Sequence, residues 1–322
     1  MNMIPSFVFR RRAMAAIRPA MSVLVVVALL VALPGLINTT VTLITKADPN
    51  IYLAGPMQDM ADFADQVRET GSINLLQQVK LAALMEKYTT ACETFLKEKG
   101  VIFFSLAALE ILLTPVMTMA LYSALLDAHR KQPLTVGSAL ARLRYAFKTL
   151  LLFLWTSLRL IAWMLPGLAL ELASILLPAP MTTPLMVIGL VLALVLGVRA
   201  ALHYVLAPVV LADQPSRGIN ECIRISWTAM RTRKMEYFML RLSFAGWTLL
   251  CYLLTSLLLG LLGNVLGMTL SMMAELLLNI YVSAAVVAFY DAYVVRGDKP
   301  EDLRAEFEGA QHSDGGANDD LN

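Results

Sequence analysis

The chain has 322 residues, of which 58% are apolar and 16% are charged. Soluble domains are roughly 45–50% apolar and about 25% charged, so this composition excludes an ordinary water-soluble globule. The formal net charge of +2 gives no indication of a nucleic-acid partner.

The apolar residues are concentrated in six stretches, each longer than the roughly 20 residues that cross a bilayer as a helix. These predicted transmembrane helices lie at 21–45, 101–124, 149–173, 184–211, 237–261 and 269–294. The sequence therefore predicts an all-α fold, a polytopic membrane helix bundle with six transmembrane helices.

A basic segment, residues 1–20, precedes the first span and carries Arg10, Arg11, Arg12 and Arg18. A basic start followed by an apolar run is also typical of a secretory signal peptide. The apolar run here continues past the length of a signal-peptide core, and no clear Ala-x-Ala cleavage site follows it. These features favour an uncleaved transmembrane helix.

Residues 46–100 form a long polar insertion between the first two spans. Apolar side chains recur at helical spacing from about 73 to 99, which predicts an amphipathic helix. A weaker helical pattern covers 57–69. One interpretation is an extracytoplasmic cap that lies on the bilayer or on the helix ends. The other is an ectodomain that binds a ligand or a partner.

Basic loops at 125–148 and 212–236 follow the second and fourth spans. Each contains an amphipathic helical pattern, which we expect to lie in the headgroup plane with its arginines toward anionic lipid. Three basic stretches each lead into a pair of spans, so we expect three hairpins, each introduced by an interfacial cytoplasmic helix. The alternative is that basic inner loops are common to any six-span protein. The polar, acidic residues 295–322 predict a disordered tail.

The distribution of Lys and Arg predicts the orientation of the spans. The N-terminal segment, the two basic loops and the tail hold 17 of these residues, and the opposite side holds 6, all in the 46–100 insertion. Cytoplasmic loops carry the excess of Lys and Arg, and long segments weigh little in this rule. We therefore expect both termini in the cytoplasm.

Two local patterns predict details of helix ends and helix packing. Pro215 is expected to end the fourth span, and Ser216 to cap the helix that follows. Ser243 and Gly246 are small residues that would permit another helix to approach the fifth span closely.

Residues from the fourth to the sixth span follow a recognisable order. They are Arg199, Tyr204, Ala207, Pro208, Leu211-Ala212-Asp213-Gln214-Pro215, Glu221, Ser226, Met230, Leu242-Ser243-Phe244-Ala245-Gly246-Trp247, Leu249-Leu250 and Ala288-Phe289-Tyr290. In this order the chain resembles the bacterial integral-membrane family catalogued as domain of unknown function 975. The resemblance implies a multi-span protein of the bacterial cytoplasmic (inner) membrane, and it brings neither a reaction nor a substrate.

Ionisable side chains inside the spans are the feature with possible chemistry, because a charge at mid-bilayer is costly unless it is paired or solvated. The candidate residues are Glu110, Arg159, Glu171, Arg199 and Glu275. One interpretation is a polar path between helices, in which Arg159 and Arg199 bind an anionic group. The other is structural, with the glutamates reaching the outer interface and the arginines paired with carbonyls or carboxylates.

The sequence contains no glycine-rich phosphate loop, no nucleophile with a plausible base and no zinc-ligand spacing. We therefore expect no enzymatic activity, no cofactor and no metal, although an intramembrane enzyme built from scattered residues stays open as a third hypothesis. The three cysteines are too far apart to predict a disulfide framework.

Two functional hypotheses lead. The first is a non-enzymatic scaffold or accessory protein; the alternative is a transporter or lipid-handling protein with a polar path lined by Arg159, Arg199 and the outer-half glutamates. The expected partners are the lipid bilayer, anionic headgroups at the basic loops, and a membrane protein or a second copy of the chain. A transporter would bring the candidate residues to one shared cavity, whereas an accessory protein would pack its spans without one.

Overall fold

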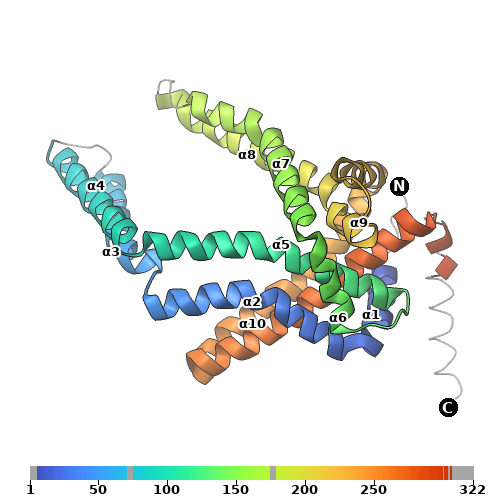
Figure 1. Ribbon diagram of the computed structural model, residues 1–322. Coiled ribbons are helices and arrows are strands. Elements are labelled where there is room, and N and C mark those ends of the chain that lie inside the picture. The colour runs from blue at the N-terminus through green and yellow to red at the C-terminus, as the bar shows by residue number, and fades with distance from the viewer. Residues whose placement is uncertain (1–5, 71–74, 175–178, 300, 304, 307–322) are drawn as a thin grey trace, which may run out of the picture. The chain divides into compact units, whose positions relative to one another are not determined.

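The computed structural model describes residues 6–70, 75–174, 179–299, 301–303 and 305–306. Every regular element in these residues is a helix, which confirms the all-α prediction (Figure 1). Six segments are long and apolar enough to cross a membrane, as in a multi-span membrane protein. They are Phe7–Thr45, Leu76–His129, Val136–Ser174, Pro184–Asp213, Ile219–Leu257 and Thr269–Arg296.

The chain divides into two compact units. The smaller unit is Ala32–Thr114, and the larger combines Met1–Val31 with Pro115–Asn322. The division falls inside two long helices, α2 (Met21–Thr45) and α5 (Val101–His129).

The smaller unit contains the polar insertion, folded as a pair of helices. These are α3 (Pro49–Thr70) and α4 (Leu75–Phe95), with a π-helical turn, η2 (Leu96–Gly100), that joins α4 to α5. Tyr52 packs on Phe95 with ring centroids 5.5 Å apart, and Lys87 pairs with Asp59 at 2.5 Å. The first helix is longer than the 57–69 pattern, because it begins at Pro49, and part of the linker between the helices lies outside the described residues.

The larger unit adds shorter helices and one very long helix to the ends of α2 and α5. Its elements are α1 (Phe7–Ile17), η1 (Arg18–Ala20), α6 (Val136–Leu140), η3 (Ala141–Tyr145), α7 (Ala146–Ser174), α8 (Ala179–Tyr204), α9 (Ala207–Asp213), α10 (Ile219–Tyr290) and η4 (Asp291–Arg296). Most of the best-buried large side chains come from α1, from the end of α5, from α9 and from both ends of α10, for example Phe9, Leu125, Leu211, Ile223 and Phe289. The core of this unit therefore lies where these ends meet.

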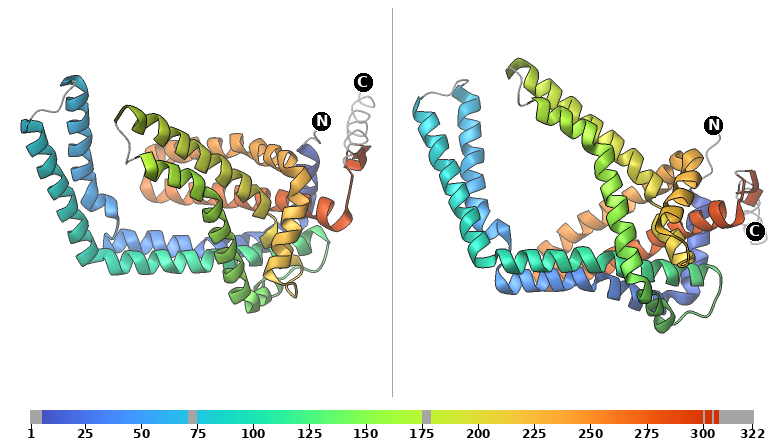
Figure 2. Two further views of the ribbon diagram at one scale, coloured as in Figure 1. Left: turned by 90° about the horizontal axis from the view of Figure 1, so that it is seen from above. Right: turned by 45° about the horizontal axis from the view of Figure 1, so that its top comes forward.

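Helices α7 and α8 lie side by side (Figure 2), and glycines let their backbones approach closely. A Cβ atom on Gly167 would lie 2.4 Å from the backbone nitrogen of Ala193, and one on Gly189 would lie 2.9 Å from the carbonyl oxygen of Gly167. Gly246, by contrast, has no atom within 4 Å of the position its Cβ would take. The prediction of close helix packing at Gly246 was therefore wrong, and the close approach occurs between α7 and α8 instead.

Helix α10 folds back on itself. Phe289 follows Tyr237 by 52 positions, which would span about 78 Å in a straight helix, yet the rings of these two residues lie 5.5 Å apart. Phe244 and Tyr281 are 5.1 Å apart in the same way. The candidate spans Ile219–Leu257 and Thr269–Arg296 thus lie antiparallel, and the link predicted at 262–268 falls where side chains are not described.

The basic loop before this hairpin differs from the expectation of a separate interfacial helix. Helix α10 begins at Ile219 and continues into the fifth candidate span without a break near residue 236. Its N-cap is Gly218, which makes no side-chain cap, so the assignment of that role to Ser216 was wrong.

A helix break separates α8 from α9, and Ser226 stabilises it. The Ser226 hydroxyl donates to the carbonyl of His203 at 2.7 Å and accepts from the backbone N–H of Leu206 at 3.2 Å. The His203 ring stacks on Trp227 with centroids 3.8 Å apart. These contacts supply hydrogen-bond partners for backbone groups that the break leaves free.

The segment predicted as a disordered tail is ordered in its first part. Gly297 ends η4 with a φ of +68°, a left-handed conformation that favours glycine. Leu303 is completely buried, and the Glu306 carboxylate pairs with Arg12. The expectation of disorder from residue 295 therefore does not describe this part, and 307–322 lie outside the described residues.

Candidate functional site

The five predicted intramembrane residues are distributed over several helices. Glu110 lies in the smaller unit and accepts a hydrogen bond from Asn38 at 2.5 Å. Arg159 lies over the Trp155 ring at 5.4 Å and donates to Asn220 at 3.4 Å. Structural contacts of this kind need no ligand.

The other three candidates do not form a site with Arg159. Glu171 packs at the α7–α8 contact, where its Cγ is 2.8 Å from the position of a Cβ on Gly189. Arg199 and Glu275 are exposed. Among the described residues, no hydrogen bond or ion pair joins any two of the four candidates of the larger unit, and none gives Arg199 the carboxylate partner expected from the sequence.

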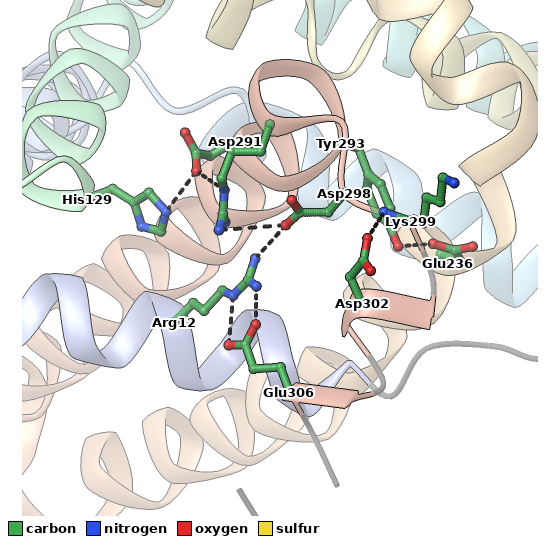
Figure 3. Close-up of polar contacts among 10 residues, drawn as sticks. Arg12, His129, Glu236, Asp291, Tyr293, Asp298, Lys299, Asp302 and Glu306 are labelled. Atoms are coloured by element: carbon green, nitrogen blue, oxygen red, sulfur yellow. Dashed lines mark hydrogen bonds and ion pairs between the residues drawn. The ribbon is translucent and has the colours of Figure 1, made fainter. Parts of the chain in front are cut away.

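Charged side chains gather instead between α1, the end of α5 and η4. Figure 3 shows Arg12 beside Asp298 and Glu306, and Asp291 beside His129. We call this the polar cluster: Arg12, His129, Arg130, Asp213, Asp291, Arg296, Asp298 and Glu306. Its members come from α1, from the end of α5, from α9, from η4 and from the segment that follows. The cluster therefore ties both chain ends to the middle of the sequence.

Arg12 is the link between the two termini. Its Nη1 lies 3.3 Å from the Asp298 carboxylate, and its Nε donates to Glu306 Oε1 at 3.0 Å while Nη2 pairs with the other carboxylate oxygen. This is the two-pronged geometry that makes arginine–carboxylate pairs strong. The helix that carries Arg12 is held in place by Phe9, whose ring packs on Phe289 with centroids 5.2 Å apart.

Asp291 forms a second group of contacts beside Arg12. Its carboxylate lies 2.9 Å from Nε of Arg296 and 3.4 Å from Nε2 of His129. Arg296 also reaches Asp298 at 3.6 Å, so the two groups share a carboxylate. The side chains of Arg12, His129, Asp291 and Arg296 line an open pocket of about 840 Å³.

Asp213 joins α9 to two other elements. Its carboxylate accepts from Arg130 at 2.5 Å and from the Tyr290 hydroxyl at 2.9 Å. The hydrogen bond with Asp213 raises the pKa of Arg130 above its ordinary value, which keeps the guanidinium charged. A buried carboxylate held by a cation and a hydroxyl is a stable junction between helices.

A family model described as "Protein of unknown function (DUF975)" matches residues 72–296, which is more than half of the chain. The chain belongs to this family. No curated protein and no solved structure matches it. The family resemblance of residues 199–290 is thus confirmed, and the matched segment extends beyond this range at both ends.

The DUF975 segment includes five of the eight residues of the polar cluster. His129, Arg130, Asp213, Asp291 and Arg296 lie inside the matched residues. Arg12, Asp298 and Glu306 lie outside them, in parts of the chain that pack onto the matched segment. Two residues that carried the resemblance, Asp213 and Tyr290, meet through a hydrogen bond.

The sequence did not predict the polar cluster as a site, because its members are far apart in the chain. Asp213 enters the sequence analysis only through the family resemblance, and Arg12 only as part of the basic N-terminal segment. The feature that could have indicated the cluster is that the loops and the tail predicted on the cytoplasmic side contain acidic as well as basic residues. No group of three or more His, Cys, Asp or Glu in the described part of the chain is placed to hold a metal ion.

Proposed function

We propose that the chain is a multi-span protein of the bacterial cytoplasmic membrane, with both termini in the cytoplasm, and that it works as a non-enzymatic scaffold or accessory protein. The polar cluster supports the placement of four segments on one side of the membrane, and the Lys and Arg distribution is the reason to assign that side to the cytoplasm. Each of the four segments that the Lys and Arg count assigns to the cytoplasm contributes to the cluster, through Arg12, Arg130, Asp213 and Glu306. Segments on opposite sides of a membrane could not meet in this way.

The observation that carries the accessory role is the separation of the intramembrane polar residues. A transport path would need them around one cavity. In the larger unit, Arg159, Glu171, Arg199 and Glu275 share no ion pair among the described residues, and none lines the pocket beside Arg12. Large apolar side chains such as Leu154 and Leu194 are more than 60% exposed, as expected for surfaces that face lipid or another membrane protein.

A complementation experiment separates the accessory role from transport. A deletion strain would carry either the wild-type gene or a variant with Glu110→Gln, Arg159→Gln, Glu171→Gln, Arg199→Gln and Glu275→Gln, with protein levels matched by immunoblot. The accessory role predicts that the variant restores competitive growth under membrane stress as well as the wild type does. Loss of complementation at a normal protein level would favour the transport alternative.

Lipid handling is the second candidate, and the pocket at the polar cluster favours it. Its lining includes five basic side chains and one carboxylate, at the end of the unit that the proposed orientation places beside the inner leaflet. Anionic lipid headgroups are the partner that such a surface would attract.

A further inference from the structure

The pocket beside Arg12 combines a basic wall with an apolar wall. The basic wall carries Arg12, His129, Arg130, Lys131 and Arg296, together with the Asp291 carboxylate that pairs with His129 and Arg296. The apolar wall consists of residues from the end of α1 to the beginning of α2, among them Ala16, Pro19 and Val23. Its volume of about 840 Å³ is within the usual range of ligand pockets.

Several donors in the basic wall are not used within the protein. Lys131 is exposed and makes no ion pair with any described residue. Arg130 uses Nη1 for its ion pair with Asp213, and a guanidinium has five N–H donors in all. Both residues follow directly on α5, where the backbone of Lys131 is left-handed, with a φ of +55°. The basic wall can therefore offer hydrogen-bond donors to an anion.

The apolar wall distinguishes a lipid from a soluble anion. It leads from α1 through η1 to α2, which is where the first candidate span enters the membrane. A phospholipid presents a phosphate next to acyl chains, so it fits both walls at once. We propose that this pocket binds the phosphate of an anionic phospholipid, with Lys131 and Arg130 as its main contacts. The inference rests on the proposed membrane orientation, because it needs this wall to face the inner leaflet.

Residues 298–306 of the C-terminal segment compete with the lipid phosphate for the guanidinium of Arg12. Glu306 holds Arg12 by two contacts, and Asp298 lies 3.3 Å from the same guanidinium. A carboxylate and a phosphate diester are both anions that arginine binds by its paired donors. Removing the Glu306 charge therefore releases the Nε and Nη2 donors of Arg12 to contact the lipid phosphate, while Asp298 stays on Nη1.

Binding can be measured by native mass spectrometry on the full-length protein in a nonionic detergent. The probes are phosphatidylglycerol, phosphatidylcholine with the same acyl chains, and inorganic phosphate. Phosphatidylglycerol should bind more tightly than phosphatidylcholine, and inorganic phosphate should not displace it. Displacement by low concentrations of inorganic phosphate would overturn the lipid assignment in favour of a soluble anion. Equal binding of the two lipids would overturn the site itself.

Variants test which residues hold the phosphate. Lys131→Asn should weaken phosphatidylglycerol binding about fivefold, the loss expected for one exposed ionic contact, and asparagine tolerates the left-handed backbone. Glu306→Gln should strengthen it severalfold. If Lys131→Asn does not fold, Gln132→Glu takes its place as the test. It adds a carboxylate to the same loop and should weaken phosphatidylglycerol binding.

The control is Lys97→Gln, which removes an exposed positive charge from η2 in the smaller unit, outside the pocket. It should leave lipid binding unchanged. Equal effects of Lys131→Asn and Lys97→Gln would contradict a specific pocket. The measurement uses protein in detergent, so its failure would leave the proposed orientation and accessory role intact.

Discussion

Asp213 holds two side chains that lie far from it in the sequence, Arg130 and Tyr290. A hydropathy profile shows this aspartate only as the polar end of a span, because the profile contains no information about the partners of a buried carboxylate. The family resemblance included both Asp213 and Tyr290 without a reason for either. The structure supplies the reason, since the end of α9 is fixed to the end of α10 by their hydrogen bond.

The variant Asp213→Asn should destabilise the larger unit by about 2 kcal/mol, because the guanidinium of Arg130 loses its charged partner. Tyr290→Phe removes one hydrogen bond and should cost only about 1 kcal/mol. Unfolding in detergent, followed by circular dichroism, measures both. Combining Asp213→Asn with Arg130→Gln should cost less than the sum of the single changes; strictly additive losses would show that the two residues act independently.

Docking of the C-terminal segment should depend on pH through Glu306. The hydrogen bond from Arg12 lowers the pKa of this carboxyl. A carboxyl whose pKa is lower in the folded state contributes stability above its unfolded pKa, and this contribution is lost as the pH falls through the folded value. The segment should therefore stay docked at neutral pH and be released progressively below about pH 4.3.

Hydrogen exchange at residues 298–306, corrected for the intrinsic rate at each pH, would follow this release. Protection should fall with acid in the wild type. In Glu306→Gln the same segment should be less protected at neutral pH and show no acid step. An identical pH profile in the two proteins would rule out Glu306 as the titrating group.

At the scale of elements, the apolar stretches predicted the long helices, and the positions of close packing could not be predicted. Small residues permit close approach only where a second helix lies against that face, and the sequence of one span does not reveal its neighbour. Gly246 is small but faces open space, whereas Gly167 faces the backbone of Ala193. The antiparallel course of α10 was predicted as two spans, because its apolar stretches are each long enough to cross a bilayer.

Substitution of Gly167 tests the contact between α7 and α8. A methyl group there would collide with backbone rather than with a flexible side chain, so Gly167→Ala should destabilise the hairpin by roughly 1–3 kcal/mol. The matched change Gly246→Ala introduces the same methyl group into open space on α10. It should be neutral or stabilising by up to about 1 kcal/mol, the helix-propensity gain. Equal melting temperatures for the two variants would contradict the close packing at Gly167.

At the scale of the whole molecule, the composition and the Lys and Arg distribution gave the multi-span class and an orientation to test. Predicting the polar cluster would have required knowing which distant helix ends meet, and no local sequence pattern contains that information. The tail was interpreted from its polar composition alone, yet Leu303 and Glu306 pack onto the larger unit. Function depends on such contacts between distant segments, so it was the property that the sequence predicted least well.

The central claim is that the segments of the polar cluster lie together on the cytoplasmic side. The native cysteines test it only in part, because Cys92 is accessible in the predicted outer insertion but Cys222 is buried. Ser216→Cys adds an exposed thiol between α9 and α10. An impermeant maleimide should label Cys92 in intact spheroplasts and should label the thiol at position 216 only after the membrane is opened. Labelling at position 216 from outside would contradict the account.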